Sequence, residues 1–92
     1  MEIDPKSIEQ SWKSRGFSCE IWTDLPGTIW ADFIHKTDEL VMLIDREIEL
    51  EMSGQIFHPE IEEEILIPAG VNHTVRNICQ VTNQWFYGYK HH

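Results

Sequence analysis

The stretch PAGVNHTVRN, residues 68–77, carries the strongest structural signal in this sequence. It follows residues 63–67, a segment that ends in three apolar residues and is typical of a strand. The tripeptide Pro68-Ala69-Gly70 ends that segment with residues that favour a tight turn. Residues 71–77 then form a second strand pattern, which contains His73. The stretch therefore predicts two strands joined by a turn, with an imidazole near the start of the second strand.

Outward from this stretch, the chain repeats the same pattern of short strands and turns. The clearest case is Glu47–Met52, where acidic and apolar residues alternate strictly, so one face of the strand is buried and the other is in water. Short strands separated by turn residues predict an all-β fold, a sandwich or small barrel. The predicted strands are residues 18–23, 28–35, 39–44, 47–52, 55–58, 63–67, 71–77 and 84–90.

A short helix is predicted ahead of the first strand. Asp4 suits the N-cap, and Pro5 suits the first helical position, where its missing N–H costs no hydrogen bond. Gly16 is typical of a helix end. We expect this helix to lie across the outside of the β-domain, with Trp12 packed against it.

Length and composition indicate one small globular domain. The chain has 92 residues, 41% of them hydrophobic, and its four Trp, four Phe and two Tyr supply apolar surface that a disordered chain lacks. We divide it into an N-terminal helical segment, residues 1–17, and a β-domain, residues 18–90. The final pair, His91 and His92, is similar to the remnant of a purification tag and is left out of the site.

The charge of the chain bears on its partners and location. A formal net charge of −9 disfavours nucleic acids and anionic membranes, which repel such a surface. No apolar run reaches the ~20 residues needed to span a bilayer, and the acidic start lacks the basic residues of a secretion signal. We therefore expect a cytoplasmic protein. In that reducing compartment Cys19 and Cys79 are expected to be free thiols that fill the core.

The strand Leu40–Ile44 has no polar face, so it is predicted to be buried on both sides. One side faces the interior of the β-domain. The other side is covered by another sheet, by the N-terminal helix or by a second subunit. The small size of the chain and its Trp content favour the last of these, and we expect a homodimer joined through sheet faces.

Three residues have the chemistry of a metal site. His35 and Glu39 are four residues apart where one predicted strand ends and the next begins, and His73 lies farther along the chain. Imidazole and carboxylate together suit divalent transition metals such as Fe, Mn, Ni or Zn. The alternative is a buried, hydrogen-bonded polar cluster without metal. Both interpretations require the three side chains to lie close together.

From Pro68 to Asn77 the sequence matches every fixed position of the second motif of the cupin family, Pro-x-Gly, two residues, His, three residues, Asn. Residues 33–46 are similar to the first motif, with His35 at its second His and Glu39 at its Glu. The chain thus resembles a small single-domain cupin, a cupin 2-type conserved barrel of the RmlC-like superfamily, over residues 18–90. The resemblance implies a double-stranded β-helix (jelly-roll) barrel with a cavity, and His35, Glu39 and His73 as the metal ligands.

Three positions depart from the family pattern. Phe33 stands where the first motif has its first His, which leaves three of the four family ligands. Arg46 and Glu62 stand where the motifs have glycines. A positive φ at such a residue costs about 1 kcal/mol, which a stable barrel tolerates. Asn77 is expected to hydrogen-bond turn backbone and to have no catalytic role.

Aromatic residues are predicted to line the same cavity. On the last strand Trp85, Tyr87 and Tyr89 share one face. Together with aromatic residues of earlier strands they form either ordinary core or a pocket in which a Tyr hydroxyl and an indole orient a small ligand. The residues predicted for this ligand pocket are Trp22, Trp30, Phe33, Trp85 and Tyr87.

Two classes of function follow from this interpretation. The first is a metal-dependent enzyme that acts on a small molecule at the open coordination positions. The second is a non-catalytic binding or sensing module, which is favoured by the missing first His and by the lack of a general base outside the three ligands. His58 precedes Pro59 and is expected in a loop. Fold cannot select among such functions.

Overall fold

The computed structural model describes residues 4–44, 47–78 and 80–91, so Arg46, Cys79 and His92 lie outside the described residues. Within these ranges the chain forms one helix and eight strands, as predicted, and every strand end lies within two residues of its predicted position. No helix among the described residues has the length and apolar character needed to cross a membrane. The elements are α1 (Pro5–Ser14), β1 (Glu20–Asp24), β2 (Ile29–Phe33), β3 (Glu39–Leu43), β4 (Glu49–Met52), β5 (Gln55–Phe57), β6 (Glu64–Ile67), β7 (His73–Arg76) and β8 (Asn83–Tyr89).

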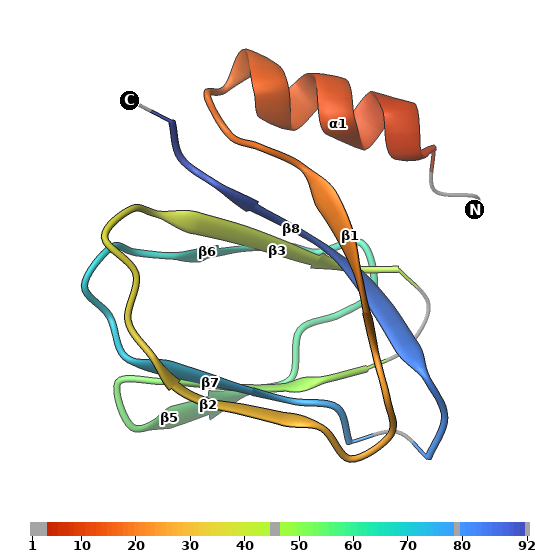
Figure 1. Ribbon diagram of the computed structural model, residues 1–92, viewed down its shortest axis with the longest axis vertical. Coiled ribbons are helices and arrows are strands. Elements are labelled where there is room, and N and C mark those ends of the chain that lie inside the picture. The colour runs from red at the N-terminus through yellow and green to blue at the C-terminus, as the bar shows by residue number, and fades with distance from the viewer. Residues whose placement is uncertain (1–3, 45–46, 79, 92) are drawn as a thin grey trace.

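The strands form two four-stranded sheets that face each other (Figure 1). One sheet has the order β1-β8-β3-β6 and the other the order β2-β7-β4-β5. All pairs of neighbouring strands are antiparallel. Strands that follow one another in sequence mostly belong to opposite sheets, as in a jelly roll. The predicted all-β jelly-roll barrel is confirmed.

The main core lies between the two sheets. The alternating segment Glu47–Met52 contributes to this core as predicted. Ile48 and Leu50 have no exposed surface. Glu49 and Glu51 accept hydrogen bonds from Arg76 on the outer side of the sheet. The rest of this core comes from strands of both sheets. Its buried members are Val41, Leu43, Ile48, Leu50, Ile67, Val75 and Trp85.

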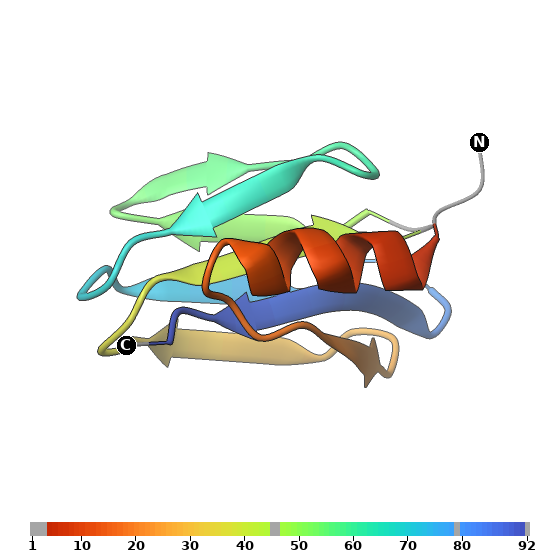
Figure 2. The same ribbon diagram turned by 90° about the horizontal axis from the view of Figure 1, so that it is seen from above.

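A second core lies on the opposite face of the β1-β8-β3-β6 sheet, beneath α1. Asp4 caps the helix by accepting a hydrogen bond from the Lys6 N–H, and Trp12, on the inner side of the helix, is completely buried. Figure 2 shows the helix lying across this sheet. The buried members of this second core are Trp12, Phe17, Leu40, Met42 and Phe86, and Cys19 is half-buried beside them.

Strand β3 is therefore buried on both faces, as predicted, and the cover on its outer face is the N-terminal helix. Val41 and Leu43 point into the main core, whereas Leu40 and Met42 point toward α1. The apolar outer face of β3 thus needs no second subunit. The apolar outer face of β3 therefore no longer supports a homodimer, and the homodimer stays a prediction.

The helix and β8 approach each other closely at Gly88. A Cβ atom at this position would lie 1.8 Å from the backbone oxygen of Ser18 and 3.1 Å from Cε3 of Trp12. The Ser18 N–H donates to the Tyr89 carbonyl at 2.9 Å, and the Tyr89 N–H donates to the Ser18 hydroxyl at 2.9 Å. These contacts fix the segment that leaves the helix against the last strand, and only glycine leaves room for them.

Strand β2 contains a bulge that determines which of its side chains face inward. Trp30 is opposite Val75, and Phe33 is opposite His73, so three steps along β2 match two steps along β7. In a regular strand, residues three apart point to opposite faces. The extra residue in the bulge restores the phase, and both Trp30 and Phe33 face the interior.

Asn77 holds the turn between β1 and β2, as predicted. Its side chain is 2% exposed, and its Nδ2 donates to the Leu25 carbonyl at 2.9 Å. Its backbone N–H donates to the Thr28 carbonyl at 2.9 Å, and its carbonyl accepts from the Gly27 N–H at 3.1 Å. This residue therefore connects the end of β7 to the β1–β2 turn and does not reach the cavity described next.

Candidate metal centre and aromatic cavity

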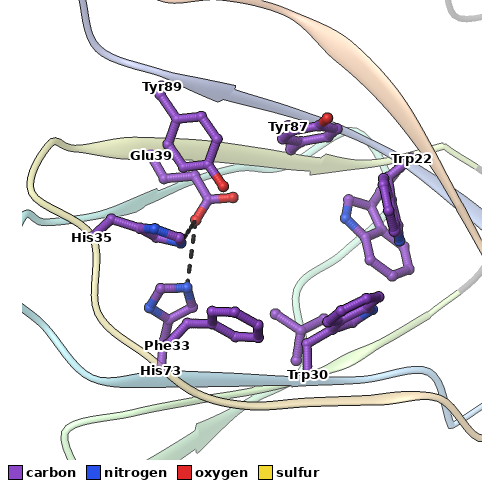
Figure 3. Close-up of a pocket in the computed structure, with 10 residues that line it drawn as sticks. Trp22, Trp30, Phe33, His35, Glu39, His73, Tyr87 and Tyr89 are labelled. Carbon is purple, nitrogen blue, oxygen red and sulfur yellow. Dashed lines mark ion pairs between the residues drawn. The ribbon is translucent and has the colours of Figure 1, made fainter.

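A cavity of about 300 Å³ is lined by side chains of both sheets (Figure 3). The three predicted metal ligands lie at one end, and aromatic rings form most of the remaining wall. Tyr89, which the sequence places on the same face of the last strand as Trp85 and Tyr87, also lines the cavity, and so does Val75, which was not predicted. The five residues predicted for the pocket, Trp22, Trp30, Phe33, Trp85 and Tyr87, all line this cavity.

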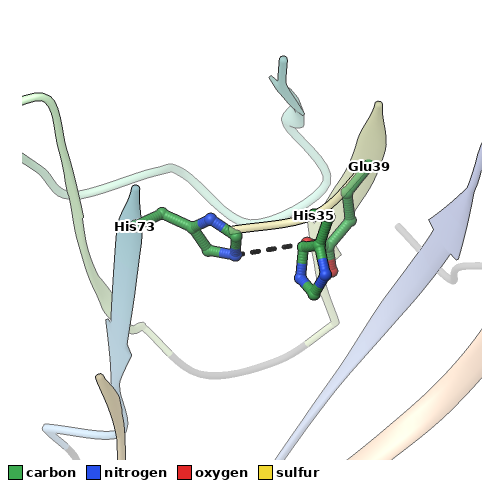
Figure 4. Close-up of side chains that lie close together, drawn as sticks. All are labelled: His35, Glu39 and His73. Carbon is green, nitrogen blue, oxygen red and sulfur yellow. Dashed lines mark ion pairs between the residues drawn. The ribbon is translucent and has the colours of Figure 1, made fainter. Parts of the chain in front are cut away.

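His35, Glu39 and His73 converge, although they come from three different segments. Glu39 is the first residue of β3, His73 the first of β7, and His35 lies in the connection between β2 and β3. Each can offer a ligand atom such that the three atoms lie within 4.8 Å of one another. Nε2 of each histidine is 3.4 Å from Oε1 of Glu39 (Figure 4).

Glu39 is the member of this group whose charged form is most disfavoured by burial. It is 7% exposed, and among the described residues its Oε1 has no hydrogen-bond partner. Burial raises the pKa of this carboxyl to about 7. Burial, and to a lesser degree the proximity of His73, lowers the pKa of His35, so that imidazole is also held toward its neutral form. A buried carboxylate oxygen without a partner is stabilised by a cation, and the two imidazoles are suitable co-ligands.

His73 is oriented by the backbone. Its Nδ1 lies 3.2 Å from the carbonyl oxygen of Val71. If Nδ1–H donates to this oxygen, the neutral ring presents the Nε2 lone pair to the space beside Glu39. Metal-binding histidines commonly have such a second hydrogen bond, which fixes the tautomer and the orientation of the ring. The three residues therefore form a group of donor atoms able to hold a divalent metal ion, with Glu39 and His73 buried and His35 half-buried.

Phe33 and Tyr89 enclose His35, the most exposed of the three. The ring of Phe33 stacks on His35 at a centroid distance of 6.0 Å and an interplanar angle of 15°. The ring of Tyr89 meets His35 edge-on at 4.9 Å. Phe33 thus occupies a place next to the ligand group as an apolar wall, where it cannot itself bind a metal ion.

Two aromatic residues of the cavity donate hydrogen bonds to carboxylates that the sequence analysis missed. Nε1 of Trp30 donates to Oδ2 of the buried Asp24 at 2.8 Å. The hydroxyl of Tyr87 donates to Oε2 of Glu20 at 2.5 Å, and this bond, together with burial, raises the pKa of Tyr87 to about 12. The pairing of β1 with β8 would have revealed the contact between Tyr87 and Glu20, because the two residues lie directly opposite each other in its register.

Comparison with known proteins gives structural matches and no sequence matches. No family model and no curated protein matches the sequence. The structure is similar to a Cupin 2 conserved barrel domain protein from Salinispora arenicola, with a TM-score of 0.72 and 18% identity over 83% of this chain and 64% of that one. The cupin domain of Cnp3 from Schizosaccharomyces pombe gives a TM-score of 0.75 and 13% identity over 84% and 57%. The Cupin 2 domain of an XRE family transcriptional regulator from Enterobacter cloacae gives 0.73 and 17% over 88% of both chains.

The chain has the cupin fold. It spans less than two thirds of the length of the first two of these proteins. At these identities the likeness concerns the fold alone, so the role of this protein has to be argued from its own cavity.

One position that departs from the cupin motif, Glu62, can be compared with the backbone that it adopts. Glu62, which stands at a glycine of the second motif, has a φ of 70°, a value that favours glycine. Its N–H donates to the carbonyl of Leu43 at 3.0 Å, which fixes the strained turn against β3. The alignment that placed Glu62 at a glycine position thus agrees with the dihedral angle that the residue adopts.

Replacing Glu62 with glycine is expected to raise the free energy of unfolding by about 0.5–1 kcal/mol, because the steric cost of a left-handed conformation is removed. Urea unfolding followed by circular dichroism measures the change. The matched control is Glu60→Gly, an exposed glutamate two residues earlier, where positive φ is not found and glycine only adds flexibility to the unfolded chain. A Glu62→Gly variant that is as destabilised as Glu60→Gly would contradict the strain at this turn.

Proposed function

We propose that this cupin binds one divalent transition-metal ion through His35, Glu39 and His73 and uses the adjoining cavity to hold a small molecule beside it. The observation that supports this most is the buried Oε1 of Glu39, which lies 3.4 Å from Nε2 of both histidines and has no hydrogen-bond partner among the described residues. Without a cation this arrangement leaves a desolvated carboxylate uncompensated. With one, the carboxylate and two imidazoles form a ligand set suited to iron, manganese, nickel or zinc.

Some residues around the site would hold the ion, and others shield it from water. Three protein ligands leave coordination positions open, and an ion bound there would supply Lewis acidity to a ligand in the cavity. The Val71 carbonyl orients His73, and Phe33 with Tyr89 shields the His35 ring. Among the described lining residues, Glu39 is the sole carboxylate, so a proton-transfer step would have to use the ligand group itself or a tyrosine.

The metal content of the protein tests this proposal. Protein without His91 and His92 is dialysed against zinc or manganese, and bound metal is measured by inductively coupled plasma mass spectrometry. We expect about one equivalent in the wild type and loss of most of it in His73→Ala. The control is His58→Ala, which removes an exposed histidine whose partner is Glu49, outside the cavity. A wild-type protein without metal, or a His73→Ala variant that keeps it, would contradict the proposed site.

A non-catalytic sensing module is the second candidate. It is supported by the likeness to the cupin domain of a transcriptional regulator over 88% of both chains and by the absence of a spare carboxylate among the described lining residues. A binding module of this kind retains its small molecule after chelation, whereas a metal-dependent enzyme loses turnover. Titration of ligand into chelator-treated protein separates the two.

The assembly and location expected from the sequence also remain proposals. A homodimer would have to use a surface other than the outer face of β3, which α1 covers. Light scattering after size exclusion measures the mass in solution. A cytoplasmic location is supported by the sequence and is checked by fractionation of the cell that produces the protein.

A further inference from the structure

The end of the cavity away from the metal ligands is an aromatic box. Figure 3 shows the rings of Tyr87, Trp22 and Trp30 on three sides of an open centre, with Glu39 and the histidines on the fourth side. The ring of Trp22 is nearly perpendicular to its neighbours. It makes an angle of 75° with Trp30 at a centroid distance of 5.6 Å, and an angle of 86° with Tyr87 at 6.0 Å.

The electrostatics of this box favour a cation. The described lining residues include no lysine or arginine. Two of the three rings donate their polar hydrogen to a carboxylate, Trp30 to Asp24 and Tyr87 to Glu20. Such a bond shifts electron density into the ring and strengthens the negative potential of its face. The two carboxylates also place negative charge next to the polar atoms of these two rings.

The shape and polarity of the box favour a methylated cation over a simple ammonium group. A primary ammonium ion needs hydrogen-bond acceptors for its three N–H groups. The walls of the box are aromatic rings, and the carboxylates of Asp24 and Glu20 already accept hydrogen bonds from two of them. A quaternary ammonium group has no N–H to satisfy, and its methyl groups gain from contact with aromatic surface.

Phe33 lies on the wall of the cavity between Trp30 and His73. Its ring centroid is 5.9 Å from that of Trp30 and 6.3 Å from that of His73. The cavity therefore has an aromatic end and an end that holds His35, Glu39 and His73, and both belong to one continuous space.

We infer that the aromatic box of Trp22, Trp30 and Tyr87 binds a small molecule that carries a methylated onium group, such as a quaternary ammonium. The inference rests on the proposed function, since it names the class of ligand for the same cavity. Its source is the set of ring orientations and carboxylate contacts, which do not depend on a metal ion being bound.

Isothermal titration calorimetry with choline on chelator-treated protein tests this inference. The comparison compound is 3,3-dimethylbutan-1-ol, which has the same shape and no charge. We expect a dissociation constant for choline below about 1 mM and binding of the neutral compound at least about tenfold weaker. Equal binding of the two compounds, or no measurable binding of choline, would overturn the inference.

Variants on strand β1 provide the structural control. Trp22 is 37% exposed and is not part of either buried core, so Trp22→Leu removes one wall of the box and leaves the fold intact. It is expected to weaken choline binding about tenfold or more, and Trp22→Phe less. Ile21→Ala alters the neighbouring residue on the other face of β1 and is expected to leave binding within about twofold of the wild type. An unchanged affinity in Trp22→Leu would overturn the inference.

The two proposals fail separately. If choline binds to protein that takes up no metal under dialysis, the metal centre is wrong and the onium site stands. If metal binds with about one equivalent and choline does not bind, the onium site is wrong and the metal centre stands.

Discussion

Replacing Glu39 with glutamine is expected to lower the affinity for a divalent transition metal by about 100-fold or more. The substitution keeps the size of the side chain and removes the negative charge that the two imidazoles cannot supply. Zinc or manganese titration of chelator-treated protein, followed by calorimetry, measures the change. An affinity within a few-fold of the wild type would show that Glu39 is not a ligand.

The same substitution is expected to stabilise the metal-free protein at high pH. Burial raises the pKa of Glu39 from 4.5 to about 7, so the folded state binds this proton more tightly than the unfolded state does. The stability from this group is complete below pH 4.5 and is lost as the pH rises through about 7. The loss amounts to about 3 kcal/mol, which Glu39→Gln avoids.

Urea unfolding at pH 4.5 and pH 8 measures this difference in chelator-treated wild type and Glu39→Gln. The matched control is Glu51→Gln, a half-buried glutamate on the outer face of the β2-β7-β4-β5 sheet that pairs with Arg76. The burial penalty at Glu39 would be contradicted if the free energy of unfolding of the wild type increased from pH 4.5 to pH 8, and increased by more than that of Glu51→Gln.

Replacing Trp12 with alanine is expected to lower the free energy of unfolding by about 4 kcal/mol. Trp12 has no exposed surface, and its ring meets that of Phe86 edge-on at a centroid distance of 6.2 Å. Removing the indole leaves a void between α1 and β8 and separates the helix from the sheet. For a domain of this size such a loss is a large part of the total stability.

Trp22→Ala is the control for this prediction, because it removes the same side chain from a site that is 37% exposed. Trp12→Phe keeps part of the ring and is expected to fold with an intermediate loss. The measurement is urea unfolding followed by circular dichroism. Equal losses in Trp12→Ala and Trp22→Ala would contradict the role of Trp12 as the contact that fixes the helix.

Much of the fold could be predicted because its signals are local. The alternation of Ile48 and Leu50 with glutamates fixes the inner face of β4, and Asp4 with Pro5 fixes the start of α1. The doubly apolar run in β3 predicted burial on both faces. It could not say what covers the outer face, because a helix, a sheet and a second subunit bury apolar surface equally well.

The three candidate ligands of the site could be predicted from the sequence, whereas the orientation and contacts of the residues around them were harder to predict. His35, Glu39 and His73 have distinctive chemistry at recognisable spacings. The inward orientation of Phe33 depends on the bulge in β2, which no residue pattern in that strand reveals. The contact of Tyr87 with Glu20 follows from the register of β1 and β8, and the contact of Trp30 with Asp24 joins strands of opposite sheets. Single-strand patterns contain neither kind of information.

The chain shares the cupin fold although no family model matches its sequence, and Glu62 illustrates how backbone and sequence can differ. The residue adopts the dihedral angles of a glycine while carrying a different side chain. Phe33 stands at the position that the sequence analysis matched to a histidine, and its ring lies 6.3 Å from that of His73. Substitutions of this kind change the residues that a sequence comparison scores and can leave the backbone in place.

The bulge in β2 also has an evolutionary consequence. Between Trp30 and Phe33 the strand has one residue more than its partner β7, yet both side chains face the cavity. Deleting that extra residue would restore regular pairing and would leave the same two rings inside. Changes of chain length are usually absorbed by surface loops. Here a strand that lines the cavity can gain or lose one residue without altering what a ligand meets.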